Sequence, residues 1–320
     1  MTENKYILSI CIPTRNRADV LVHTLDSIVN NPFFSNEIEV VVSDNASTDG
    51  TQQLVKKYTK RFANVRYYRE NENVGVHKNI VKVLDVASGC FLKLNNDYSV
   101  FTSDGLEKII YVVKKYIDKH NLLLFDNTIG RKGVDFIEDM DINQLIQYEG
   151  WGLSFMGEYG FWREDWQCIE NKLERAATMF ILDGHFLRMM TKKKTANVCI
   201  LHYMDRYLFQ QKQGGYNFFK VHTLEYLSLF EEYYRLNQIS KETYDVLHYK
   251  LFTSLLPFLT KFLITEKENY SYDLNGWFGY FFRAFGQYIW FYPKMIRWEL
   301  SSSLRKIKKI YHHVKILSRH

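Results

Sequence analysis

The chain has 320 residues, of which 46% are hydrophobic and 24% are charged, and these values are typical of a globular protein, not a disordered one. Its four cysteines show no C-x-x-C spacing, which argues against a disulfide or zinc framework and favours a reducing compartment. The net charge of +6 arises in the tail, because residues 283–320 carry nine Lys and Arg against the single acid Glu299. A charge confined to the tail disfavours nucleic acid as a partner.

The N-terminus shows no signal-peptide pattern, and the longest apolar stretch, residues 251–264, is interrupted by Lys261. That stretch is shorter than the roughly 20 residues that cross a bilayer. We therefore expect a cytoplasmic protein without a membrane-spanning helix.

Short apolar runs alternate with segments of helical periodicity in the first half of the chain. The predicted strands are residues 7–12, 38–43, 65–69, 91–94 and 122–125, and the predicted helices lie at residues 21–28, 54–62, 80–87 and 106–117. This alternation is typical of parallel βα units, so it predicts a doubly wound α/β sheet of five strands. Ligands of such sheets bind at the carboxyl ends of the strands.

The alternation fades after about residue 130, and long helical patterns rich in Tyr and Phe dominate from residue 225 onward. We place a domain boundary near residue 220. The expected architecture is therefore an α/β domain followed by a helical, aromatic and basic region, residues 221–320.

Four polar clusters follow the first four predicted strands, at residues 13–17, 43–51, 71–75 and 95–97. Turn and capping preferences explain any one of these clusters. Because all four strands are predicted to be parallel, the clusters should meet at one edge of the sheet. Their joint placement therefore predicts a ligand site.

Three of these segments resemble motifs of family 2 glycosyltransferases with the GT-A fold. They read I-P-T-R-N from residue 12, V-S-D-N-A-S-T-D-G-T from residue 42 and N-V-G-V-H-K-N from residue 73. The resemblance covers about 120 residues. It implies a GT-A catalytic domain over residues 1–220, with nucleotide-sugar binding in residues 1–130 and the acceptor side in residues 131–220.

The resemblance also implies an activity of EC 2.4 type. The expected enzyme is an inverting hexosyl- or N-acetylhexosaminyl-transferase that uses a nucleotide-diphosphate sugar, with a UDP-sugar favoured. Its acceptor would be a lipid-linked or polymeric bacterial surface glycan of the capsule, O-antigen or teichoic-acid type.

The physical chemistry of the clusters agrees with a donor site. A carboxylate at Asp44 can accept the imide N–H of uracil or thymine, and the turn after the first strand offers two guanidinium groups to ribose and phosphates. Gly75 permits close approach of the backbone. The predicted donor-binding residues are Pro13, Thr14, Arg15, Arg17, Asp44, Asn45, Asn73, Gly75, Lys78, Asn79, Asn95 and Asn96.

Members of the resembling family bind a divalent ion through a D-x-D motif after the fourth strand, where this chain has Asn95, Asn96 and Asp97. One carboxylate suffices when phosphates and waters complete the octahedron, and Asn carbonyl oxygens are suitable ligands. Asp97 is therefore the predicted ligand of Mg²⁺ or Mn²⁺. The alternative is that Arg15, Arg17 and Lys78 replace part of the metal's charge.

Inverting transfer needs a base for the proton of the acceptor hydroxyl. The resemblance implies an Asp at the start of a helix, and Asp183 is the predicted residue because an apolar run precedes it and a helical pattern follows. Asp165 is the alternative, and either residue could instead only cap a helix. His185 and His202 are possible further proton or metal partners.

Two further segments leave alternatives open. The aromatic segment around Tyr159, Trp162 and Trp166 predicts either core packing or an acceptor channel. Residues 283–320 predict binding to an anionic membrane surface, which would place the enzyme at the inner membrane face. A helical subdomain or a homo-oligomer contact explains the tail equally well.

Two rival functions remain to be compared. A partner subunit that binds nucleotide sugar without catalysis is suggested by the neutral pair Asn95 and Asn96. An oxidoreductase or sugar-nucleotide synthase is disfavoured because neither G-x-G-x-x-G nor G-x-x-x-x-G-K-[ST] follows a predicted strand.

Overall fold

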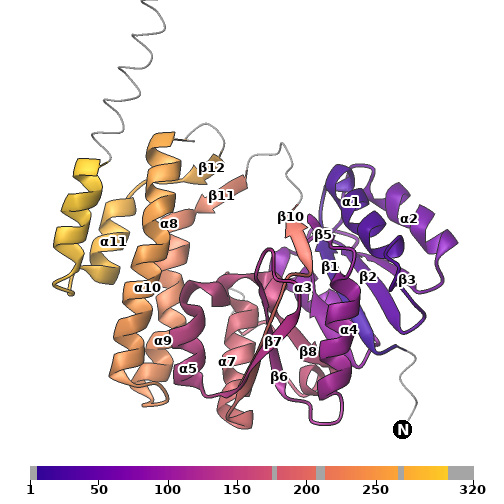
Figure 1. Cartoon of the computed structure of the whole chain (residues 1–320). Helices are drawn as coiled ribbons and strands as arrows, with labels where there is room; N and C mark the ends of the chain where they lie inside the picture. Colours follow the sequence, from indigo (N-terminus) through magenta and orange to yellow (C-terminus); the bar gives the residue numbers. More distant parts are fainter. Residues whose placement is uncertain (1–5, 175–178, 207–212, 266–269, 302–320) are drawn as a thin grey trace, which may run out of the picture. The chain divides into compact units, whose positions relative to one another are not determined.

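The computed structural model describes residues 6–174, 179–206, 213–265 and 270–301. The chain divides into two compact units (Figure 1). The first unit contains Met1–Leu145 and Gly152–Phe209, and the second contains Ile146–Trp151 and Gln210–His320.

A five-stranded sheet in the order β3-β2-β1-β4-β8 forms the centre of the first unit. Its strands are β1 (Leu8–Thr14), β2 (Ile38–Asp44), β3 (Val65–Arg69), β4 (Phe91–Leu94) and β8 (Gly160–Trp162). The first four strands are parallel, and β8 runs antiparallel to β4. Their aliphatic and β-branched side chains suit a sheet that is covered on both faces. The predicted α/β fold with a mostly parallel sheet is confirmed.

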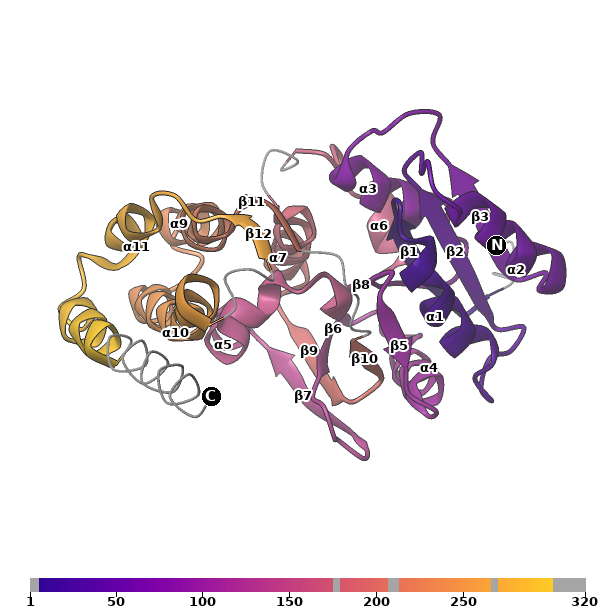
Figure 2. The same ribbon diagram turned by 90° about the horizontal axis from the view of Figure 1, so that it is seen from above.

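Helices cover both faces of this sheet, as the crossover connections of parallel strands require. They are α1 (Ala18–Val29), α2 (Thr51–Arg61), α3 (Val76–Val86) and α4 (Gly105–Tyr116). Leu25 of α1 and Ile109 of α4 share one hydrophobic core with Ile10 of β1. Figure 2 shows α3 on the opposite face of the sheet. The predicted helices therefore form close to their expected positions.

The prediction that residues 122–125 form the fifth strand of the same sheet is wrong. The segment does form a strand, β6 (Leu122–Asn127), but β6 pairs with β9 (Ala196–Leu201) in a separate three-stranded sheet that is completed by β7 (Val134–Met140). A single isolated bridge, Leu124 to Tyr159, links β6 to the segment that precedes β8. An apolar run predicts a buried strand but does not name its partner.

The fifth strand of the first sheet is the short β8, which packs on β4 through Gly160. A Cβ atom at this position would lie 2.3 Å from the ring of Phe91, so only glycine allows the strand to approach so closely. Phe91 also packs edge-on against Trp162, with 4.9 Å between the ring centroids.

Short elements connect the two sheets. They are β5 (Ser99–Phe101), α5 (Ile142–Glu149), η1 (Gly150–Ser154), η2 (Met156–Glu158), α6 (Arg163–Gln167), α7 (Ile181–Lys193) and β10 (Met204–Arg206). Strand β10 pairs with β5, so Arg206 lies opposite Ser99. This pairing brings the end of the first unit next to the segment that follows β4.

The second unit is helical, as expected. Its elements are β11 (Gln213–Asn217), α8 (Phe218–Lys220), η3 (Val221–Glu225), α9 (Tyr226–Arg235), α10 (Lys241–Thr260), η4 (Lys261–Thr265), β12 (Tyr270–Asp273) and α11 (Trp277–Phe285). Aromatic rings make much of its core, for example Phe252 of α10 against Phe281 and Phe285 of α11. Among the described residues, no helix combines the length and apolarity needed to cross a membrane.

Candidate functional site

The turns that follow β1 and β4 meet at the carboxyl edge of the first sheet. The backbone N–H of Asn95 donates to the carbonyl oxygen of Cys11 at 2.9 Å. The hydroxyl of Thr14 donates to Oδ2 of Asp97 at 2.8 Å, and the guanidinium of Arg17 lies 3.5 Å from Oδ1 of the same carboxylate. Two of the predicted clusters are therefore in direct contact.

Asp97 is the charged centre of this junction. Its side chain is largely buried, and the hydroxyl of Thr24 donates to its carbonyl oxygen at 2.9 Å. Burial raises the pKa of Asp97, while Arg17 and Thr14 act in the opposite direction. The carboxylate is thus held in one position before any ligand arrives.

The turn after β2 joins the same edge. The backbone N–H of Asn16 donates to the hydroxyl of Ser47 at 2.8 Å, and the N–H of Thr48 donates to Oδ1 of Asn16 at 2.7 Å. Asp49 accepts hydrogen bonds from the N–H groups of Ala18 at 3.1 Å and Thr51 at 3.0 Å. These bonds fasten the starts of α1 and α2 to one another, beside the ends of their strands.

Asp44 is completely buried at the end of β2. Its Oδ1 accepts from the N–H of Ser47 at 2.8 Å, and its Oδ2 accepts from the hydroxyl of Tyr67 at 2.5 Å. Arg69, which is paired with Asp44 in the strand register, places its Nε 3.6 Å from Oδ2. Tyr67 and Arg69 were not predicted as site residues, because only the register of β3 brings them to Asp44.

The third cluster is tied to the second by amide side chains. The side-chain amide of Asn45 donates to Oδ1 of Asn73 at 2.9 Å, and the amide of Asn79 donates to the carbonyl oxygen of Ser43 at 3.0 Å. Gly75 has a φ of 88° at the start of α3, a conformation that favours glycine. All four predicted clusters therefore converge.

Cationic side chains surround this edge. Arg15 and Lys78 are exposed, and Pro13 is half-buried at the end of β1. Arg17 lies over the ring of Tyr98 at 5.8 Å, and Arg206 lies over the same ring at 5.2 Å. Tyr98 and Arg206 were not among the predicted residues, and for Arg206 no local motif could have indicated its position.

The residues at the end of β4 fit a divalent ion. Oδ1 of Asn95 is buried and has no hydrogen-bond partner among the described residues, although its amide nitrogen donates to the carbonyl oxygen of Asn96 at 2.9 Å. Carbonyl and carboxylate oxygens are the donors that Mg²⁺ and Mn²⁺ prefer. In the described part of the chain no group of three His, Cys, Asp or Glu could hold a metal, so an ion at Asp97 would need phosphate and water ligands.

A buried lysine supports the turn after β4. Lys93 is fully buried, and its ammonium donates to the carbonyl oxygen of Leu94 at 3.1 Å and to the hydroxyl of Tyr203 at 3.2 Å. It also donates to the carbonyl oxygen of Gly157. Burial lowers the pKa of Lys93 to about 7. Lys93 is the one charged residue in the apolar segment 91–94, and this pattern in the sequence could have indicated a buried lysine.

Asp183 lies in the first turn of α7 and is buried. Burial raises the pKa of Asp183 to about 8, although hydrogen bonds from its own backbone and from Tyr159 act to lower it. Its Oδ1 has no hydrogen-bond partner among the described residues. The N–H of Leu94 donates to the carbonyl oxygen of Tyr159 at 3.1 Å, so Tyr159 connects Asp183 to the end of β4.

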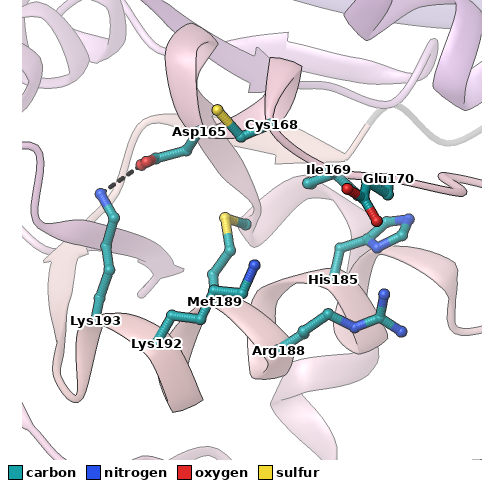
Figure 3. A pocket seen from close by; sticks show the side chains of 9 residues that line it. All are labelled: Asp165, Cys168, Ile169, Glu170, His185, Arg188, Met189, Lys192 and Lys193. Atoms are coloured by element: carbon teal, nitrogen blue, oxygen red, sulfur yellow. Dashed lines mark hydrogen bonds and ion pairs between the residues drawn. The ribbon is translucent and has the colours of Figure 1, made fainter.

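Asp165 has a different environment. It lies in α6 beside a cavity of about 240 Å³ that is lined by α7, and its carboxylate pairs with the ammonium of Lys193 at 2.5 Å (Figure 3). His185 lines the same cavity and places its Nε2 2.8 Å from the carbonyl oxygen of Lys172. The carboxylate of Asp165 is therefore neutralised by a neighbouring cation.

His202 and the aromatic segment are the remaining predicted candidates. His202 accepts from the N–H of Gly130 at 3.2 Å and pairs with Asp205 at 3.0 Å. Tyr159, Trp162 and Trp166 are each only 1% exposed. These three rings belong to the core, so the alternative that they line an open acceptor channel is wrong.

Comparison with known proteins identifies the family. Residues 9–137 match the sequence profile described as glycosyl transferase family 2. Residues 9–137 of the chain belong to glycosyl transferase family 2. The family profile covers the strands and turns that carry Thr14, Asp44 and Asp97.

Two relatives show how far the similarity extends. The glycosyltransferase is 24% identical over 272 residues to the abequosyltransferase RfbV of Salmonella typhimurium, covering 75% of this chain and 79% of RfbV. It is 32% identical over 104 residues to the GalNAc(5)-diNAcBac-PP-undecaprenol beta-1,3-glucosyltransferase of Campylobacter jejuni, covering 32% of this chain and 33% of that enzyme. The second match is thus confined to about a third of each chain.

A solved structure supports the fold over a greater length. A fragment of S. aureus TarS in complex with UDP-GlcNAc superposes with a TM-score of 0.54 at 18% identity, covering 87% of this chain and 79% of that one. The shared fold therefore extends well beyond residues 9–137.

Proposed function

We propose that this glycosyltransferase transfers a hexose or N-acetylhexosamine, with inversion, from a UDP-sugar to a hydroxyl of a bacterial surface glycan. The observation that carries the proposal is the junction of Thr14, Arg17 and Asp97, where the turns after β1 and β4 of the first sheet meet. The proposed acceptor class follows from relatives that include an abequosyltransferase and a GalNAc(5)-diNAcBac-PP-undecaprenol glucosyltransferase.

The donor would bind along the carboxyl edge of the sheet. Arg15, Arg17 and Lys78 supply positive charge for the diphosphate. The base would be recognised at Asp44, where an imide N–H replaces the hydrogen bond that Tyr67 now donates. Asn45, Asn73 and Asn79 hold the loops in place.

A divalent ion would be held by Asp97 with the carbonyl oxygen of Asn95. When bound, it would neutralise the charge that develops on the leaving diphosphate. The guanidinium of Arg17, already 3.5 Å from Asp97, would share this role.

Asp183 would act as the base. The acceptor oxygen forms a bond to the anomeric carbon, its proton passes to the Asp183 carboxylate, and the bond from the anomeric carbon to the phosphate oxygen breaks with its electron pair leaving on the diphosphate. A buried carboxyl with a pKa of about 8 is a stronger base than an exposed one. Asp165 is less suited because Lys193 neutralises it.

The experiment that tests the proposal is a thermal-shift screen of UDP, dTDP, GDP and CDP, each with and without Mn²⁺. We expect UDP to stabilise the wild type most, Asp44→Ala to abolish the shift, and Asp97→Ala to remove its dependence on metal. Tyr67→Phe, which frees one oxygen of Asp44, should retain or strengthen the shift. A chain that no nucleotide stabilises would contradict the proposed donor site.

A second candidate function is a partner subunit that binds nucleotide sugar without catalysis. The neutral Asn95 and Asn96, in place of the acidic residues of the family motif, favour it. Such a subunit would show the same thermal shifts but would leave the donor intact, so turnover of the donor separates the two functions.

A further inference from the structure

A polar cavity of about 380 Å³ lies among α9, α10 and α11 of the second unit. Small-molecule sites typically occupy about 300–1,000 Å³, and the cavity beside Asp165 is smaller, at about 240 Å³. None of the residues that line the cavity of the second unit belongs to the donor site. Its lining therefore calls for a separate explanation.

The floor of the cavity combines apolar groups with one buried polar side chain. Leu227, His248 and Ala284 are buried there. Nδ1 of His248 lies 2.8 Å from the carbonyl oxygen of Tyr244; a carbonyl only accepts, so Nδ1 carries the proton and Nε2 is an acceptor. Burial lowers the pKa of His248, which keeps the ring neutral. A neutral imidazole with one acceptor nitrogen therefore belongs to the lining of the cavity.

One wall is aromatic. The rings of Tyr234 on α9 and Tyr244 on α10 stack with centroids 4.6 Å apart and planes 11° from parallel. Both residues are only half-buried, and both line the cavity. Flat rings of this kind pack against the C–H faces of sugar rings.

Charged and amide side chains complete the lining of the cavity. Arg283 and Gln287 are exposed at the rim. Glu231 and Arg235, which also line the cavity, form an ion pair at 2.5 Å. One guanidinium, that of Arg283, is therefore left without a paired acid in the lining. Such a balance favours a neutral polyhydroxyl ligand over a strongly anionic one.

We propose that this cavity is a saccharide-binding site for one or two sugar residues of a glycan. The inference rests on the proposed function, because it takes the glycan acceptor as the source of the ligand. Two sites on one chain would raise the apparent affinity for a polymeric acceptor through effective concentration, without any change at the donor site.

The test is saturation-transfer difference NMR on the intact chain with glucose, galactose, N-acetylglucosamine and rhamnose as separate probes. We expect at least one sugar to bind in the millimolar range, and Tyr244→Ala and Arg283→Ala each to weaken it by about tenfold or more. Arg297→Ala, an exposed arginine of the same unit outside the cavity, is the matched control and should bind as the wild type does.

Absence of binding by every probe, or binding that neither cavity variant changes, would overturn the proposal. Binding of inorganic phosphate, but of no sugar, that depends on Arg283 would overturn it in favour of an anion site. Because Arg283 is exposed, its variant should fold even if Tyr244→Ala does not. The thermal shift with UDP, measured on the same variants, should remain unchanged, so a failure of the donor site is seen separately from a failure of this cavity.

Discussion

Asp183 combines burial with a position in the first turn of a helix, and these two features determine its chemistry. Removal from water disfavours the charged carboxylate and raises the pKa to about 8. A base with this pKa is matched to proton transfer near neutral pH. Tyr159, which hydrogen-bonds to Asp183, also accepts a hydrogen bond from the N–H of Leu94 at the end of β4.

We expect the rate of sugar transfer to rise with pH up to about 8 and then to level off, since only the carboxylate form of Asp183 accepts a proton. Asp183→Asn should lower kcat by at least about 100-fold while leaving the thermal shift with UDP unchanged. A pH profile of kcat/KM on both proteins measures this.

The same pKa has a consequence for stability. The folded state binds the proton of Asp183 more tightly than the unfolded state, so its contribution to stability falls as pH rises from the ordinary pKa of 3.8 to about 8. Asp183→Asn should therefore have a higher Tm than the wild type at alkaline pH. An equal or lower Tm there would argue that the carboxylate is not buried as described.

At the scale of elements, the close contact between β4 and β8 holds in place the turn after β4, which carries Asp97. Gly160→Ala would put a Cβ atom 2.3 Å from the buried ring of Phe91, so the strands must separate or the ring must move. We expect a loss of about 2 kcal/mol in the free energy of unfolding, measured by urea denaturation.

The matched control is Gly279→Ala in α11, where a Cβ atom would meet nothing within 4 Å. Replacing a helical glycine in open space should leave stability unchanged or raise it by about 0.5–1 kcal/mol. Equal effects at both positions would show that the contact between Gly160 and Phe91 is not tight.

The parallel strands of the first sheet and the helices that cover it were predictable, because apolar runs mark the strands and a helical repeat of apolar residues marks the helices. Strand β8 has three residues, too few to show a period, and the partner of β6 is a tertiary choice that no local pattern encodes. The family resemblance indicated Asp44 and Asp97 as candidates, and the structure buries both side chains at the ends of their strands. The hydroxyl and guanidinium that hold Asp44 could not be predicted, because they depend on the register of β3.

At the scale of the whole molecule, the concentration of basic residues in the tail predicts binding to an anionic membrane surface. Most of the basic tail, residues 302–320, lies outside the described residues, so its proposed membrane contact rests on composition. We expect the chain to sediment with vesicles containing anionic phosphatidylserine, at about 1 kcal/mol per Lys or Arg near the surface, and to be released by salt.

Vesicles of neutral phosphatidylcholine are the control for this experiment, and a chain without residues 302–320 is the matched variant. Binding that persists in the shortened chain would place the membrane contact elsewhere. Binding to neither kind of vesicle would leave the helical or oligomeric interpretation of the tail.

The most direct measurement of the central claim is release of nucleoside diphosphate from UDP-, dTDP-, GDP- and CDP-linked sugars with Mn²⁺ present. We expect the glycosyltransferase to consume a UDP-sugar. Asp97→Asn and Asp183→Asn should each lower the rate by at least about 100-fold, whereas Asp165→Asn should leave it close to that of the wild type. If UDP stabilises the chain but no donor releases its nucleoside diphosphate, the proposed transfer is contradicted and the chain is a nucleotide-sugar-binding subunit instead.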